Sequence, residues 1–288
     1  MKPILHITSG DIAGERLANS GLAGEVFVWH DILYDGPRNP GWPADDTLSA
    51  RARFLEAVTG GGLDRDFVRE TLDGQYARLA AAQGNAHIVL WFDACLFDQA
   101  MLCHILACMK ARGIAAELIC LDSFPGVVPF NGLGQLSPAQ LASVYDRRTM
   151  VTADQFLFAE RVERAFAGQD RREFAALATC ADPPLPWIPA AVARWLKEQP
   201  DPPTGLSLLQ RLALAAMQTG CTSPAEIYAA VAANDAPPQF WGDTTLWAAI
   251  NALAERHPPL ARIAGPLPRL PQWHGIADLT LFRVYPAE

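Results

Sequence analysis

The chain of 288 residues has no excess of basic residues: 23 Lys and Arg stand against 31 Asp and Glu, which gives a formal net charge of -8. A protein with this balance repels the phosphates of nucleic acids, so the composition disfavours a nucleic acid partner. No window approaches eighteen uninterrupted apolar residues, and Met1 to Pro3 lead into a predicted strand rather than a signal peptide. We therefore expect a cytoplasmic protein without a membrane partner.

Strong local motifs of several enzyme classes are also missing. The sequence has no P-loop, no complete dinucleotide-binding fingerprint and no nucleophile elbow. Its six cysteines show no C-x-x-C spacing and lie in apolar segments, which is typical of free buried thiols. Cys103 and Cys108 share a predicted helix with His104, but their spacing does not place them on one face of it. We predict no metal site, and the sequence identifies no cofactor.

Four short apolar runs in the first half of the chain each end on an acidic residue. The runs are 3–11, 26–31, 87–93 and 118–122. Helical patterns follow them at 13–20, 47–58, 66–82 and 97–112. Short runs rich in Val, Ile and aromatic residues that alternate with helices are typical of a parallel sheet. Residues 1–135 are therefore predicted to form a Rossmann-like α/β domain with a mainly parallel sheet.

The rest of the chain is predicted to be mainly helical. Residues 136–204 form a helical connecting segment, with capping-box patterns at Ser137 and Thr152. Residues 205–288 predict helices at 207–219, 223–233 and 243–256 and strands at 260–264 and 279–284. This order is typical of a winged helix.

The third helix of this winged-helix-like module is poorly suited to DNA. It carries two acids, one Arg and one Asn, where base readout needs Arg, Lys, Asn or Gln. The module also holds Trp241, Trp247 and Trp273. We therefore expect it to pack on the rest of the chain or to bind a partner protein.

Three blocks of sequence stand out in order along the chain: His6-Ile7-Thr8-Ser9-Gly10-Asp11, Asp31-Ile32-Leu33-Tyr34-Asp35-Gly36-Pro37 and Leu90-Trp91-Phe92 with Leu96-Phe97-Asp98-Gln99. Together they resemble a bacterial family of domains of unknown function, numbered eighteen thirty-five. The similarity continues through 130–136 and 205–207, so it covers nearly the whole chain. It implies a shared topology and site but names no substrate. Where relatives resemble Glu-His-Asp, this chain has Asp93-Ala94-Cys95, so an activity of that His and Asp would be lost or altered here.

The candidate site is the carboxyl edge of the predicted sheet, because ligands of open α/β sheets bind beyond the carboxyl ends of the strands. Catalytic roles are predicted there for His6, Asp11, Asp31 and Asp93, in general acid–base or metal-assisted hydrolysis or group transfer. Candidate ligand-binding residues are Ser9, Gly10, Asp35, Arg147 and Arg148. The two arginines would reach the edge from the helical segment and meet an anionic group.

These residues also have structural alternatives. A strand histidine such as His6 is often a satisfied core residue, Ser9 or Asp11 can cap the helix that follows, and Asp35 fits a turn. Two functions stay open at this stage. The first is binding of a small polar or anionic ligand at the carboxyl edge, with or without catalysis. The second is a ligand-sensing regulatory or adaptor protein whose winged-helix-like module binds a partner protein or, as the less favoured case, DNA. The sequence indicates no oligomeric state.

Overall fold

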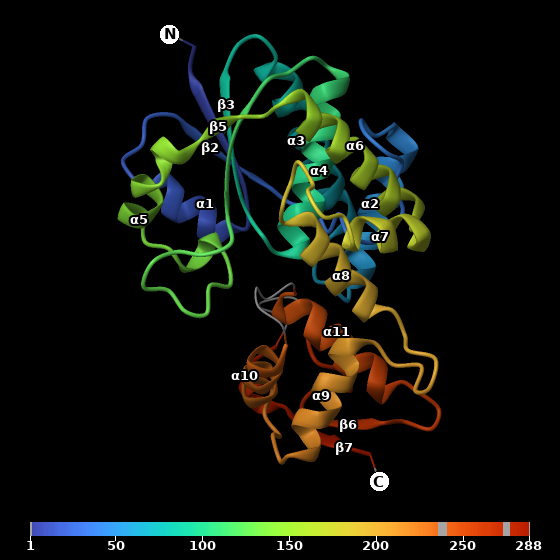
Figure 1. Cartoon of the computed structure of the whole chain (residues 1–288). Coiled ribbons are helices and arrows are strands. Elements are labelled where there is room, and N and C mark those ends of the chain that lie inside the picture. Colours follow the sequence, from blue (N-terminus) through green and yellow to red (C-terminus); the bar gives the residue numbers. More distant parts are fainter. Residues whose placement is uncertain (1, 236–240, 273–276, 288) are drawn as a thin grey trace.

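The computed structural model describes residues 2–235, 241–272 and 277–287 (Figure 1). Its main sheet contains β1 (Ile4–Ser9), β2 (Glu25–Trp29), β3 (His87–Asp93), β4 (Glu117–Leu121) and β5 (Thr149–Met150), in the order β2-β1-β3-β4-β5. The strands β1 to β4 are parallel, which confirms the predicted mainly parallel α/β sheet. The short β5 pairs antiparallel with β4. Thr149 and Met150 lie in the segment predicted to be helical, so the prediction was wrong for these two residues.

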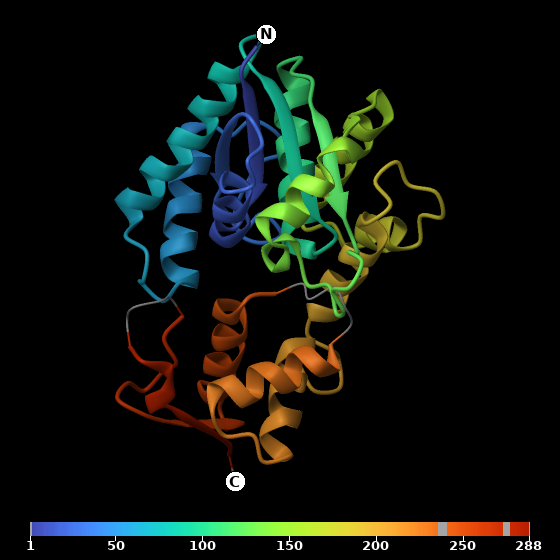
Figure 2. The same ribbon diagram turned by 90° about the vertical axis from the view of Figure 1, so that its left-hand side faces the viewer.

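Helices cover both faces of the sheet (Figures 1 and 2). The helices are α1 (Asp11–Ala18), α2 (Asp45–Val58), α3 (Arg65–Ala82), α4 (Leu96–Ala111), α5 (Pro138–Ser143), α6 (Ala153–Gly168), α7 (Arg171–Ala178) and α8 (Ile188–Glu198). Val89 and Trp91 of β3 pack on the side of α1 and α5, whereas Ile88, Leu90 and Phe92 pack on the side of α2, α3, α4 and α6. Because both faces are buried, the strand is apolar at nearly every position.

A buried polar network joins the connecting segment to the sheet domain. Glu163 of α6 accepts a hydrogen bond from His104 Nδ1 of α4 at 2.8 Å and pairs with Arg38 at 3.1 Å. The capping boxes predicted at Ser137 and Thr152 are confirmed at the starts of α5 and α6. These contacts fix α6 against α4, so the connecting segment is part of the same packed body.

The C-terminal residues form α9 (Leu208–Gln218), α10 (Pro224–Asn234), α11 (Asp243–Ala254), β6 (Ala261–Ala264) and β7 (Arg283–Pro286), with β6 and β7 antiparallel. Residues 279–281 form a 3-10 helix rather than the predicted start of a strand, because Asp278 caps a turn there by accepting a hydrogen bond from Thr280 N. The winged-helix assignment remains a prediction, and Trp273 lies outside the described residues.

This C-terminal module packs beneath the carboxyl ends of the parallel strands (Figure 1). Gln272 Nε2 donates a 2.6 Å hydrogen bond to the carbonyl of Val58, and Tyr34 Oη lies 3.4 Å from Thr245 Oγ1. None of the helices in the described ranges combines the length and apolar character needed to cross a bilayer.

Candidate functional site

A cavity of about 940 Å³ lies at the carboxyl edge of the sheet, against the start of α11. Its walls come from the ends of β1, β2 and β3, from α2 and α3, from the loop 131–135 and from residues 241–245. This volume is within the range of small-molecule sites, and the position is where α/β sheets bind ligands. We call this space the interdomain cleft.

Aromatic and acidic side chains give the interdomain cleft its chemical character. The aromatic ones are Trp29, Phe67, Phe97 and Trp241 beside Tyr34 and His30, and the acidic ones are Asp11, Asp31, Asp93, Asp98 and Asp243. Among the described residues, no Lys or Arg lines the cleft, and the residues outside the described ranges include none. An anionic ligand, as expected from the sequence, would therefore find no cationic side chain in the cleft wall.

Asp11 and His30 form a pair at the mouth of the cleft. Asp11 opens α1, and His30 follows the last residue of β2, so both stand at strand ends. The His30 Nε2–H group donates a 2.8 Å hydrogen bond to Asp11 Oδ1. The Gly10 before Asp11 has a φ of 71°, and α1 has no side-chain cap. The carboxylate of Asp11 is therefore turned toward His30 rather than back onto the helix.

Asp93 and Asp98 form a second, buried pair in the cleft wall. Ser9 Oγ donates to Asp98 Oδ1, and the Asp93 backbone N–H donates to Asp98 Oδ2 at 2.7 Å. Asp93 in turn accepts the N–H of Cys95 at 2.9 Å and the N–H of Leu133 at 3.1 Å. Ser9 is thus a partner of this acid pair and lines the cleft beside it.

Burial raises the pKa of both carboxyl groups. The pKa of Asp98 is raised well above its usual value, first by burial and then by the charge of Asp93. The pKa of Asp93 is raised by burial, while hydrogen bonds from Cys95 and Leu133 act in the opposite direction. Both shifts favour the neutral form of a carboxyl group, most strongly at Asp98, and a neutral carboxyl group can act as an acid at the cleft wall.

This pair and Cys95 are also the described residues whose ligand atoms lie close enough together to hold a metal, within 4.8 Å of one another. Each of the four carboxylate oxygens already accepts a hydrogen bond. Burial raises the pKa of the Cys95 thiol, and a protonated thiol is a poor ligand.

Asp31 lines the cleft but is engaged by Arg51. The two side chains form a buried ion pair, and Arg51 also donates to the carbonyls of Asp35 and Ile32, at 2.6 and 2.9 Å. The Asp35 carboxylate accepts the N–H of Gly36 at 2.7 Å and does not line the cleft. The contacts of Asp31 and Asp35 thus hold the loop after β2, in keeping with the turn alternative for Asp35.

His6 lies away from the interdomain cleft. It is 1% exposed and projects to the face covered by α1 and α5, between Trp91 and Tyr145. Its Nδ1 accepts a 3.1 Å hydrogen bond from Trp91 Nε1, and its Nε2 donates to the carbonyl of Ala23 at 3.1 Å. Burial lowers the pKa of His6, so the ring is neutral. The structure does not bring His6 together with Asp11, Asp31 and Asp93.

Arg148 is placed at the opposite end of the sheet. Its Nε donates a 2.9 Å hydrogen bond to Glu117, the first residue of β4, and its guanidinium stacks on Tyr145. Arg147, beside it, is exposed and does not line the cleft. The contact with Glu117 places the Arg148 side chain at the amino edge, and neither arginine lines the cleft at the carboxyl edge.

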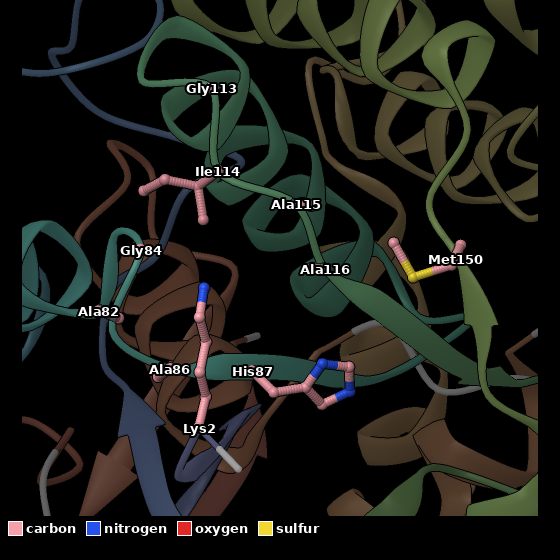
Figure 3. Close-up of a pocket in the computed structure, with 10 residues that line it drawn as sticks. All are labelled: Lys2, Ala82, Gly84, Ala86, His87, Gly113, Ile114, Ala115, Ala116 and Met150. Carbon is pink, nitrogen blue, oxygen red and sulfur yellow. The ribbon is translucent and has the colours of Figure 1, made fainter.

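A smaller cavity of about 280 Å³ lies at this amino edge (Figure 3). Glycine, alanine and Ile114 form most of its wall, with Lys2, His87 and Met150 at its sides. The His87 Nε2 atom lies 2.6 Å from Glu117 Oε2. This volume is below the usual range of small-molecule sites, and the cavity is remote from the acid pairs.

Sequence reasoning missed three contributions to the cleft. His30 stands at a strand end and could have been found by the same rule as Asp31. Asp98 is absent from the predicted site residues, although its side chain is 2% exposed and accepts a hydrogen bond from Ser9. Trp241 to Thr245 come from the C-terminal module, and no local pattern indicates that they meet the sheet edge.

A scan against protein-family models gives no match, and a search of curated proteins gives no significant relative. The resemblance to the eighteen thirty-five family therefore stays a prediction from the sequence blocks.

Proposed function

We propose that this protein binds a small organic molecule in the interdomain cleft and acts on it by general acid–base chemistry, as a hydrolase or group transferase. The observation that carries the proposal is the convergence of two proton-handling pairs, Asp11 with His30 and Asp93 with Asp98, on one cavity with apolar walls. Perturbed carboxyl groups in a concave apolar site are the arrangement found at many active sites.

The two pairs suit opposite tasks. Asp11 orients the imidazole of His30 through Nε2, and in the described part of the chain His30 Nδ1 has no hydrogen-bond partner. That nitrogen can accept a proton from a water or a ligand hydroxyl group. Burial and the charge of Asp93 raise the pKa of Asp98, which favours its neutral form, and in that form Asp98 can donate a proton to a leaving group.

A buried donor also supports ligand binding. Trp29 lines the cleft, and its buried indole N–H has no acceptor among the described residues. Leaving a buried donor unpaired costs stability, and an acceptor atom of a ligand that enters the cleft would remove that cost.

The test is a thermal-shift screen of small molecules on three proteins: the wild type, Thr244→Trp, which fills the cleft at the start of α11, and Thr179→Trp, its control at the exposed end of α7. We expect compounds that stabilise wild type and Thr179→Trp but not Thr244→Trp. Turnover of these compounds is then followed by mass spectrometry. Stabilisation that Thr244→Trp leaves unchanged would contradict binding in the cleft.

The second candidate function is a ligand sensor. It is favoured because two parts of the chain form the cleft: the sheet domain forms most of the wall, and residues 241–245 of the C-terminal module form the rest. A ligand held by both parts would change how the module is presented to a partner. Two results together would favour this alternative. A ligand should bind in the cleft without being turned over, and a partner should bind either the ligand-free or the ligand-bound protein but not both.

A further inference from the structure

The C-terminal module is joined to the sheet domain through α8 and a turn-rich linker. Residues 199–207, between α8 and α9, form bends and turns, and the module lies below the sheet domain (Figure 1). Relative motion is common between parts of a chain that a short linker joins. The contacts that cross from α8 to the module therefore decide how firmly the module closes the interdomain cleft.

A buried ion pair is the central contact between α8 and the module. Arg194 lies one turn before the end of α8, and Asp235 follows the last residue of α10. Arg194 Nε donates to Asp235 Oδ1 at 3.1 Å and Arg194 Nη2 donates to Asp235 Oδ2 at 2.9 Å, with the side chains 3% and 2% exposed. Arg194 Nη1 donates to Glu198 Oε2 at 2.8 Å, and the same oxygen accepts the Leu209 N–H of α9 at 3.2 Å. One guanidinium thus connects the two sides of the linker.

Trp241 connects this ion pair to the interdomain cleft. Its indole N–H donates a 2.6 Å hydrogen bond to Asp235 Oδ2, the oxygen that also accepts from Arg194 Nη2. The Trp241 ring lies edge-on to Tyr228 of α10, with 5.3 Å between the ring centroids, and Trp241 lines the cleft. A displacement of the cleft wall at Trp241 therefore acts directly on the carboxylate of Asp235.

The polar character of these contacts favours a closure that can be reversed. A buried ion pair loses the hydration of both charges, so its net contribution to stability is small although its geometry is specific. When the two parts separate, water hydrates the carboxylate and the guanidinium and offsets the loss of their attraction. Tyr34 Oη and Thr245 Oγ1, 3.4 Å apart, form a further polar contact beside the cleft that water can replace. These bonds define one closed arrangement and can be exchanged for water.

We propose that Arg194, Asp235 and Trp241 form a latch that holds the C-terminal module closed on the interdomain cleft. Release of the latch lets the module move about residues 199–207 and opens the cleft. This inference goes beyond the proposed function, because opening is a property of the protein without any ligand. The latch also gives the sensor alternative a physical basis, since a ligand in contact with Trp241 would change the balance between the closed and open states.

Two cysteines of α4 report opening of the cleft separately from unfolding. Cys95 precedes α4 and lines the cleft, where it is 8% exposed, whereas Cys103 lies within α4 and is 0% exposed. Opening of the module exposes Cys95 alone, and unfolding of α4 exposes both residues. The probe is iodoacetamide, and mass spectrometry of peptides from the full chain gives the alkylation rate of each cysteine. When opening and closing are fast compared with alkylation, this rate is proportional to the open population.

We expect Asp235→Asn to speed the alkylation of Cys95 at least about tenfold, because Arg194 loses its charged partner. Arg194→Lys keeps the charge but loses the two-pronged contact, and Trp241→Phe loses one hydrogen bond, so each should give about a threefold to tenfold increase. Asp235 and Arg194 do not line the cleft, so their substitution reaches Cys95 only through the latch. The rate at Cys103 should stay within about twofold of the wild type in all three variants.

The matched control is Glu255→Gln, which breaks an exposed ion pair with Arg269 in the same module and should change neither rate. An unchanged rate at Cys95 in the folded variants would overturn the latch. Equal increases at Cys95 and Cys103 would overturn it too, because the contacts would then stabilise the whole fold rather than the closed cleft. If Asp235→Asn does not fold, Arg194→Lys and Trp241→Phe decide the question by the same two rates.

Discussion

The backbone of Gly132 lies directly against the carboxylate of Asp93. A β-carbon at Gly132 would lie 2.5 Å from Asp93 Oδ2, and the next residue, Leu133, donates its N–H to the same oxygen at 3.1 Å. Gly132 has a φ of 138°, which side chains rarely adopt. The loop that closes the cleft therefore depends on a glycine to bring a backbone donor to a buried acid.

Gly132→Ala should thus destabilise the protein. The new methyl group combines an unfavourable backbone angle with a contact that the carboxylate cannot relieve without losing its hydrogen bonds, and we expect a loss of about 2 kcal/mol in the free energy of unfolding. Urea denaturation measures it. Gly134→Ala is the control, because its β-carbon would meet only Ile12 at 3.7 Å, an ordinary contact. Equal effects of the two substitutions would contradict the close packing of Gly132 on Asp93.

Asp31→Asn should behave as a core substitution. Removing the charge leaves the buried guanidinium of Arg51 without its carboxylate, although two carbonyls still accept from it. Breaking a buried pair in this way costs about 3 kcal/mol. Asp35→Asn, in the exposed turn nearby, should cost less than about 1 kcal/mol. If Asp31→Asn unfolds at the same urea concentration as the wild type, the ion pair does not hold this loop.

Asp98→Asn should change how stability depends on pH. Because the pKa of Asp98 is raised in the folded protein, its contribution to stability is fully present below the pKa of the unfolded chain, near 4, and is lost as the pH rises through the folded value. Asparagine does not titrate, so the free energy of unfolding of the variant should rise relative to that of the wild type as the pH increases above about 4. The difference in the free energy of unfolding is about 1.4 kcal/mol for each unit between the folded and unfolded pKa values of Asp98. It is smaller if the titration of Asp98 is coupled to that of Asp93.

The measurement for Asp98 is urea denaturation of both proteins at several pH values in that range. All other ionisable groups are common to the two proteins, so their effects largely cancel in the difference. A difference that stays flat with pH would mean that Asp98 carries no proton in the folded state, and the neutral acid of the proposed mechanism would be lost with it.

The positions of the first four strands and of Asp11, Asp31 and Asp93 could be predicted because each depends on local sequence. An apolar run marks a buried parallel strand, and the residue after it marks the carboxyl edge. The location of the His6 side chain could not be predicted by the same rule. Strand alternation places its side chain on the face of α1 and α5, and only the position of Trp91 on the neighbouring strand shows that its ring is satisfied there.

Other parts of the site depend on contacts between distant residues. Arg148 was expected at the carboxyl edge because nothing in Thr149 and Met150 indicates a strand, yet their pairing with β4 sends the chain to the other edge. Asp98 follows Ser9 by 89 positions, and their hydrogen bond exists only once α4 packs beside β1. A single sequence carries no signal for such pairings.

Asp11→Asn tests the proposed reaction most directly. The side chain is 85% exposed, so loss of its charge should shift the melting temperature by less than about 2 °C. Asparagine keeps the size of the side chain, but it replaces an ionic acceptor for His30 Nε2 by a neutral one and no longer stabilises a protonated imidazole. Turnover of compounds found in the screen should fall by about two orders of magnitude or more.

His30→Asn should give a similar loss of turnover, and the turnover of the double variant should be little lower, because the two residues act as one unit. Additive losses would mean that the residues act separately, and unchanged turnover in a folded Asp11→Asn protein would remove the pair from the mechanism.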